Sequence, residues 1–417
     1  AVASVIADPN FDGDGINSNW QDELFRTGHT RGADVYVSGG SNKGRYSFGV
    51  SAVDQEGIYI DTRFERYNFN INSEGNVKNR VKIGQNLSLG HSQRVSPVVW
   101  GGREPLYNAI ALPPYIPVRT ADGQFGSSLD SRDGNDAINI VRVTETQDNL
   151  NSFNSVYGNV YADFQIIDGL SFRTQYGLYA FFSNQNDISR AFQTTGRASQ
   201  SETFINKGRS QFLSQQITNT LTYGQSFAKH NLNVTLVQES QDKNFSNVST
   251  FLSTDLTSEL EEIVNGTSES FSIPEKLFSY LGRINYDFDE RYLLQLSLRR
   301  DKSSKFPEAN QVGWFPAASV GWIVSKEGFG FINAWNINNL KVKASYGVTG
   351  NNQIGFNAFT SAIARDFFYP VDGQVRDGAF IDGGNNPNLR WEEATKQNYG
   401  VEVGLWNNSI TASVDYF

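Results

Sequence analysis

Short and long connections alternate between the amphipathic strands that this sequence predicts. Strands are recognised by alternating apolar and polar residues, because successive side chains on a strand point to opposite faces of a sheet. The short links are 41–45, 73–76, 168–169, 227–230, 289–291 and 406–409, and the long links are about 54–64, 93–150, 183–208, 240–276, 300–313 and 348–392. A further link on the short side, about 325–338, is longer than this pattern expects. Such alternation predicts an all-β, up-and-down antiparallel barrel with tight turns at one end and long loops at the other.

Each predicted strand has one apolar and one polar face. The clearest case is 280–300, where Gly282, Ile284, Tyr286, Phe288, Tyr292, Leu294, Leu296 and Leu298 alternate with Arg283, Asn285, Asp287, Gln295, Ser297 and Arg299. Residues 66–72 and 399–416 repeat the pattern. An apolar face toward lipid and a polar face toward a wet interior are typical of a transmembrane β-barrel. A soluble sandwich or propeller also has alternating strands, so that alternative stays open here.

Composition excludes a helical membrane protein. Hydrophobic residues make up 38% of the chain, and no stretch approaches the ~20 apolar residues that a transmembrane helix needs. A barrel tolerates this composition, because only alternate strand residues meet lipid. The aromatic residues Tyr292, Trp314, Trp322, Tyr399 and Trp406 stand at predicted strand ends, where interfacial girdles are expected; in a sandwich they would be core residues. The net charge of −9 provides no basic stripe for nucleic acid.

Residues with catalytic or metal-ligating chemistry are few. The chain has no cysteine, which excludes disulfides, thiolate metal sites and cysteine nucleophiles. His29, His91 and His230 are scattered, without metal-ligand spacing. Asp8 to Asp14 resemble the opening of a calcium loop, but Asn19 stands where the bidentate glutamate is required, so a solvated acidic turn is favoured. No catalytic, cofactor-binding or metal residue is therefore predicted, and no enzyme activity.

One aromatic loop is a candidate for substrate contact. Trp100, Tyr107 and Tyr115 lie in a proline-containing segment of the longest predicted link. Their rings could stack on sugar rings or on peptide side chains, yet loop aromatics also commonly pack within their own loop. Both interpretations are open at this stage.

Short motifs follow one another along nearly the whole chain. They are NWQDELFRTG (19–28), VSGGS (37–41) with Tyr46, DQEGI (54–58), FERY (64–67), GRINY (282–286), RYLL (291–294), LRRD (298–301) with Ser303, Ser304 and Phe306, WFP (314–316), VGW (320–322), LKVKASYG (340–347), TGN (349–351) and NPNLRWE (386–392). In this order, these motifs resemble the SusC-like branch of TonB-dependent outer-membrane transporters. Lys302 departs from the glycine that this family usually has there.

This resemblance implies a barrel of about 22 strands, the number found in plugged outer-membrane transporters. It implies that residues 1–31 follow the plug region. The alternating pattern gives about fourteen strands in residues 32–417, so the resemblance places the plug and the last strands outside this sequence. The expected location is the outer membrane, in contact with its lipid. The expected partners are a SusD-like surface lipoprotein acting as a lid and the TonB complex, which would act through an N-terminal part outside this sequence.

The function implied by the resemblance is import of a large nutrient, an oligosaccharide or an oligopeptide, without a cofactor. Substrate-binding residues are not assigned, because the family's contacts lie in variable loops. Among the motifs, Arg299 is expected to pair with Asp301 of the adjoining loop and to fix that loop. Two alternatives remain: a structural outer-membrane barrel subunit of a larger complex without transport, and a secreted β-rich glycan hydrolase, which would need two carboxylates at a defined separation.

Overall fold

The fold is described from a computed structural model of the chain. The structure describes residues 15–96, 104–127, 137–196, 199–254, 266–355, 358–360, 362–382 and 386–417. The possible calcium loop at Asp8 to Asp14 and the loop residue Trp100 lie outside these ranges. Among the described residues, no helix has the length and apolar character needed to cross a membrane.

Sixteen strands and a few short helices make up the described chain. The strands are β1 (Thr30–Ser41), β2 (Gly44–Glu56), β3 (Arg63–Lys78), β4 (Val81–Val95), β5 (Gln147–Ile167), β6 (Leu170–Ser189), β7 (Thr203–Phe227), β8 (His230–Thr254), β9 (Thr267–Phe288), β10 (Tyr292–Ser303), β11 (Val312–Ile323), β12 (Ile337–Asn351), β13 (Ala362–Val371), β14 (Gln374–Asp382), β15 (Glu392–Leu405) and β16 (Ile410–Tyr416). The helices are α2 (Trp20–Leu24), α3 (Pro105–Ala111), α4 (Ile140–Thr146) and α5 (Gly330–Ala334), with 3₁₀ turns η2 (Glu308–Asn310) and η3 (Val324–Glu327).

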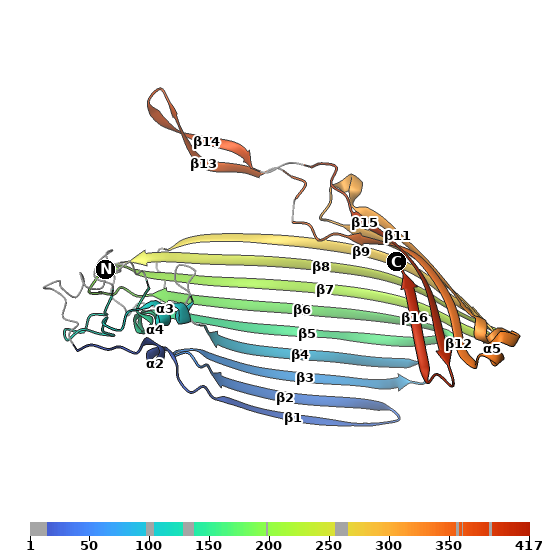
Figure 1. Ribbon diagram of the computed structural model, residues 1–417. Helices are drawn as coiled ribbons and strands as arrows, with labels where there is room; N and C mark the ends of the chain where they lie inside the picture. Colours follow the sequence, from blue (N-terminus) through green and yellow to red (C-terminus); the bar gives the residue numbers. More distant parts are fainter. Residues whose placement is uncertain are drawn as a thin grey trace.

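Fourteen of these strands form one curved antiparallel sheet in chain order, β1 to β12 followed by β15 and β16. Every neighbouring pair is antiparallel, and β13 pairs with β14 in a separate hairpin that projects away from the sheet (Figure 1). Helices α2, α3 and α4 gather at one end of the strands, whereas α5 lies at the other end (Figure 1). The prediction of about fourteen up-and-down strands is therefore confirmed.

The tight turns lie at the α5 end and the long connections at the α2 end. Five of the predicted turns are confirmed within a residue or two: those after β1, β5, β7, β9 and β15. The turn predicted at 73–76 is wrong, because β3 continues to Lys78 and the turn is formed by Asn79 and Arg80. Gly75 is instead paired with both Gly44 and Ile83 inside the sheet. The longer short-side link, 324–336, contains η3 and α5.

The outer face of the sheet carries an apolar band between two levels of aromatic side chains. At the turn end, ring contacts run from Phe227 through His230, Phe288 and Tyr292 to Trp322, with centroids 4.9 to 6.5 Å apart. At the loop end of the same face, Trp314 is paired with Arg300, which is eight residues beyond Tyr292 on β10. Eight residues span about 26 Å along a strand, or about 20 Å of membrane thickness at a tilt of ~40°. The distance between the two aromatic levels is therefore close to the apolar band of about 25 Å in outer-membrane barrels, and somewhat shorter than it.

Candidate functional site: the inner wall and its loop clusters

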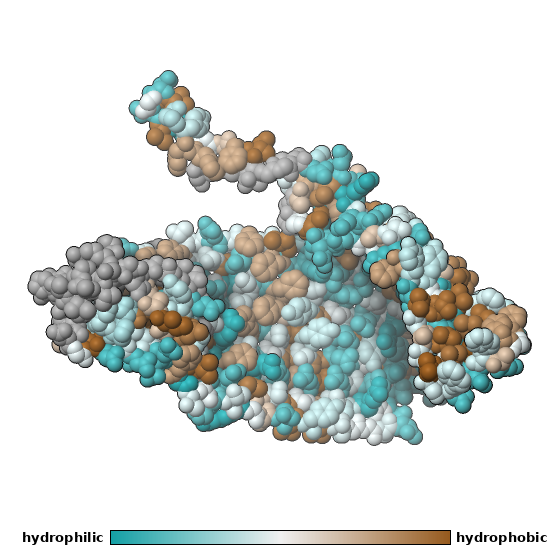
Figure 2. Space-filling view, viewed as in Figure 1, coloured by the Kyte–Doolittle hydropathy of each residue, from teal (hydrophilic) through white to brown (hydrophobic). Residues whose placement is uncertain are grey.

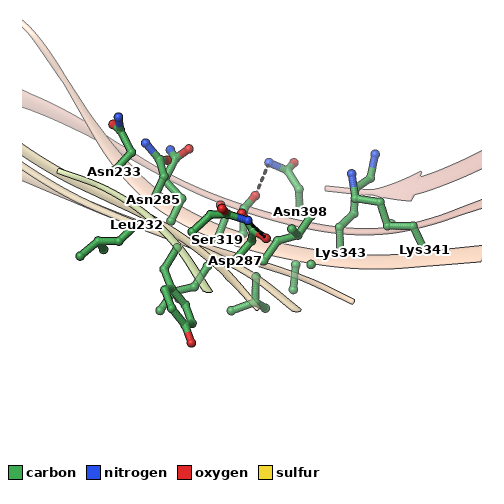
Figure 3. A pocket seen from close by; sticks show the side chains of 18 of the residues that line it. Leu232, Asn233, Asn285, Asp287, Ser319, Lys341, Lys343 and Asn398 are labelled. Atoms are coloured by element: carbon green, nitrogen blue, oxygen red, sulfur yellow. Dashed lines mark hydrogen bonds between the residues drawn. The ribbon is translucent and has the colours of Figure 1, made fainter. Parts of the chain in front are cut away.

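A continuous row of polar side chains crosses the inner face of the sheet. The register places its members opposite one another from β8 to β15: Asn233, Asn285, Gln295, Ser319, Ser345 and Asn398. Figure 3 shows Asn233 and Asn285 on one side of the strands and Leu232 on the other. The row lines a concavity of about 880 Å³. The predicted alternation is thus confirmed: the polar side chains of several neighbouring strands lie together on one face of the sheet.

An ion-pair network lies beside this row on β12, β15 and β16. The Lys343 ammonium is 2.7 Å from a Glu402 carboxylate oxygen and 3.0 Å from an Asp415 carboxylate oxygen. Lys341 lies 3.9 Å from the second oxygen of Glu402. A Cβ at Gly400 would come within 2.2 Å of the Asp415 carboxylate, so this network requires the glycine. The charges neutralise one another within the wall.

Arg299 and Asp301 form the ion pair that the motif predicted, at 2.8 Å. The predicted location of Asp301 in a loop is wrong, because β10 extends to Ser303 and both residues belong to that strand. Two residues apart on a strand, they point to the same face, which is why they meet. Arg299 also donates to Ser279 on β9 at 3.0 Å. The pair therefore joins β9 to β10 at the loop end of the inner wall.

A second polar network joins β2 to β6 near the tight turns. Glu74 accepts a hydrogen bond from the Tyr161 hydroxyl at 2.8 Å and pairs with Arg45 at 2.8 Å. The Arg173 guanidinium lies 4.4 Å from the Tyr161 ring centroid and donates to Asp163 at 2.8 Å. These contacts connect strands that are far apart in sequence and fix the inner wall at this end.

Two compact clusters of apolar side chains lie at the long-loop end of the sheet, and we call them the loop clusters. The first loop cluster has a buried centre of Trp20, Leu24, Ala109, Leu112, Ile116, Ala137 and Ile140. The Trp20 indole donates to the Pro113 carbonyl at 3.2 Å, so the NWQDELFRTG motif anchors the loop between β4 and β5. Tyr115 packs against this cluster, which supports the loop-packing interpretation of that residue. Tyr107 is 48% exposed.

The second loop cluster joins three motifs. Phe306, Phe315 and Trp391 are buried together, with the Trp391 ring centroid 5.0 Å from that of Phe306 and 5.3 Å from that of Phe315. The Trp391 indole also donates to the Gln311 carbonyl at 3.0 Å. A Cβ at Gly350 would lie 2.1 Å from the Phe315 ring, which explains the glycine of the TGN motif. These motif residues therefore stabilise loops and have no exposed reactive group.

A buried arginine stands between the first loop cluster and the sheet. Arg142 of α4 is 2% exposed, and its guanidinium carbon lies 4.1 Å from the Phe192 ring centroid. Burial lowers the pKa of Arg142 to about 10, so the side chain stays protonated at neutral pH. Together with Phe192, Gln200 and Glu202 it lines a cavity of about 450 Å³.

The three histidines lie apart from one another. His91 Nδ1 is 2.8 Å from the Asn154 amide oxygen and His230 Nδ1 is 2.7 Å from the Tyr286 hydroxyl, both on the outer face. His29 immediately precedes β1, and its Nδ1 lies 3.9 Å from a Glu56 carboxylate oxygen. Within the described ranges, no three histidine or carboxylate side chains are grouped in a way that could hold a metal ion.

Comparisons with known proteins agree with this architecture. The family model "TonB dependent receptor-like, beta-barrel" matches residues 101–417. TonB-dependent receptor P3 of Formosa agariphila is 29% identical over 419 residues, covering 96% of this chain and 41% of the relative. TonB-dependent receptor SusC of Bacteroides thetaiotaomicron is 24% identical over 442 residues, covering 96% and 42%.

The fold also matches solved structures. The RagAB peptide transporter superimposes with a TM-score of 0.78 at 24% identity, covering 96% of this chain and 45% of that chain. This chain spans less than half the length of these relatives. The match to the family model, the antiparallel wall and the apolar outer band all have the same explanation: the chain belongs to the TonB-dependent receptor-like β-barrel family, whose members are outer-membrane proteins.

Proposed function

We propose that this chain forms part of the barrel wall of a SusC-like transporter that imports a large nutrient across the outer membrane. The observation that carries the proposal is the polar inner row from Asn233 to Asn398 on a sheet whose outer face is apolar. A wall of this kind separates a wet passage from lipid. Residues 1–31 would follow the plug region and residues 32–417 would form the wall. The cargo is an oligosaccharide or an oligopeptide.

The proposed partners are a SusD-like lipoprotein lid at the long-loop end and the TonB complex at the opposite end. The β13–β14 hairpin supports the first partner, because it projects beyond the sheet (Figure 1) and leaves Phe368, Val375 and Ile381 each at least two-thirds exposed. A two-stranded hairpin is marginally stable by itself and gains stability by packing against another surface. RagAB, which has the same fold, is described as a peptide transporter.

The test is affinity purification of the tagged transporter, expressed from its complete gene in its own host, from detergent-solubilised outer membranes. We expect a surface lipoprotein to co-purify, and a deletion strain to lose growth on either an oligosaccharide or an oligopeptide as the sole carbon source. A strain with normal growth on both cargo classes would contradict transport and favour a structural subunit. Release of sugar products by the purified protein alone would instead favour the glycan hydrolase.

A further inference from the structure

The inner wall carries an aromatic surface that neither the loop clusters nor the polar networks use. It covers β5 to β9 in the half nearer the long loops, and it consists of Phe153, Tyr157, Tyr179, Phe181, Phe212, Phe245 and Phe271. We call this the inner aromatic patch. Figure 2 shows apolar side chains among polar ones over the middle of this concave face.

Strand register explains why these rings meet. Tyr157 is opposite Tyr179, and Phe181 is opposite Phe212, which is opposite Phe245. Ring centroids are 6.2 Å apart for Tyr157 and Tyr179 and 5.6 Å apart for Tyr179 and Phe212. Phe153 contacts Phe181 and Phe245 contacts Phe271 at similar distances, 5.7 and 5.8 Å. The patch extends about 13 Å along the strands and about 19 Å across them.

Several of these rings are open to the interior. Tyr157 is 61% exposed, Phe271 is 52% exposed and Tyr179 is 39% exposed. On the outer face, exposed aromatic side chains are explained by lipid, but this surface faces the wet side of the wall. A contiguous exposed apolar surface in water marks a binding site more often than an accident of composition.

Uncharged hydrogen-bonding side chains separate the rings. Register places Ser155, Ser183, Ser210, Ser214 and Asn247 among them. The charged side chains in the same rows are Lys243 and Glu275, which are paired with each other at 3.6 Å. Lys305 adds a second contact to Glu275 at 3.2 Å. The patch therefore presents apolar rings and neutral hydrogen-bonding groups, and its charged side chains are confined to one edge, where Lys243 and Lys305 share Glu275.

We propose that the inner aromatic patch is a stacking surface for a neutral oligosaccharide inside the barrel. The apolar faces of sugar rings can lie on the aromatic rings while their hydroxyl groups bond to the serine and asparagine side chains. An oligopeptide brings charged termini, and burying these against aromatic rings and neutral hydrogen-bonding groups is unfavourable. This inference rests on the proposed transport function and selects between its two cargo classes.

The test is a binding experiment on the complete transporter in detergent. The probes are maltohexaose, laminarihexaose, mannohexaose and xylohexaose, with hexaalanine as the peptide probe, measured by titration calorimetry. The variant is Tyr157→Ala with Tyr179→Ala, and the conservative variant replaces both with phenylalanine. The matched control is Phe182→Ala, because Phe182 follows Phe181 on β6 but points to the outer face, opposite Asn154 and Gln211.

We expect at least one hexasaccharide to bind, with a dissociation constant about tenfold or more higher in the double alanine variant. The phenylalanine variant and Phe182→Ala should bind like the parent. Failure of every hexasaccharide to bind, or binding of hexaalanine instead, would overturn the proposal. Unchanged sugar affinity in the alanine variant would also overturn it. If the melting temperature of that variant were lowered at the same time, the patch would be a packing surface for another part of the protein. Growth of the deletion strain tests transport separately, so loss of the patch's role would leave the proposed function standing.

Discussion

Trp391→Ala is expected to open the loops that the second loop cluster holds without unfolding the sheet. Replacing a buried tryptophan by alanine costs about 3–5 kcal/mol, and the lost hydrogen bond to the Gln311 carbonyl adds about 1 kcal/mol. A local loss of about 4 kcal/mol corresponds to roughly a thousandfold faster amide exchange. Trp391→Phe should keep most ring contacts and lose only the hydrogen bond.

Hydrogen exchange in detergent measures this effect at amides whose bonds lie in the two loops. These include the Ser303 amide, bonded to the Gln311 carbonyl, and the Leu389 amide, bonded to the Asn386 carbonyl. The control is Trp335→Ala, because Trp335 is 72% exposed at the opposite end of the sheet. Equal acceleration in both variants, or acceleration along the whole of β10 to β12, would refute the idea that Trp391 stabilises these loops locally.

Three further perturbations test the wall itself. Gly350→Ala should destabilise the loop end by about 1–3 kcal/mol, because the added Cβ meets the Phe315 ring; an unchanged melting temperature would contradict this. Leu296→Lys, on the outer face, should lower the free energy of folding into lipid vesicles by about 2–4 kcal/mol. Gln295→Lys, at the neighbouring inner-face position, should lower it much less. Equal losses in the two variants would contradict the assignment of faces. Hydrogen bonds from Tyr292 and then Trp322 lower the pKa of Glu327 from its ordinary value of 4.5. The ionised Glu327 therefore stabilises the fold above pH 4.5, and this contribution is lost as the pH falls through the lowered pKa. Amides of η3 should then exchange faster, and an unchanged exchange rate down to about pH 2 would refute this prediction.

The strand pairs around the tight turns could be predicted from the sequence because one face of each strand meets lipid. Where the strands extend beyond the apolar band, that difference between faces disappears. On β8, Gln238, Ser240 and Asp242 occupy the outer face, so the alternation ends there although the strand continues to Thr254. This is why the link predicted at 240–276 is much longer than the observed one, 255–266.

The loop clusters could not be predicted, because they depend on contacts between distant segments. Trp20 and Pro113 are 93 residues apart, and no local pattern connects them. The turn predicted at 73–76 failed for a related reason. Its Ser-Glu-Gly-Asn sequence has the composition of a turn, yet Glu74 is held within the sheet by Arg45 and Tyr161 from neighbouring strands.

The motifs identify the family without identifying the cargo, and the structure gives a physical reason. Trp20, Phe315 and Trp391 are buried in loop clusters, where any exchange for a smaller side chain leaves a cavity. None of the motifs lies between residues 150 and 275, which is the stretch that contains the inner aromatic patch. The side chains of the patch face the interior and lie outside the two loop clusters, so the packing that fixes the loop anchors does not constrain them. Differences in cargo between related transporters should therefore arise in this stretch and in the long loops, while the anchors that hold those loops stay the same.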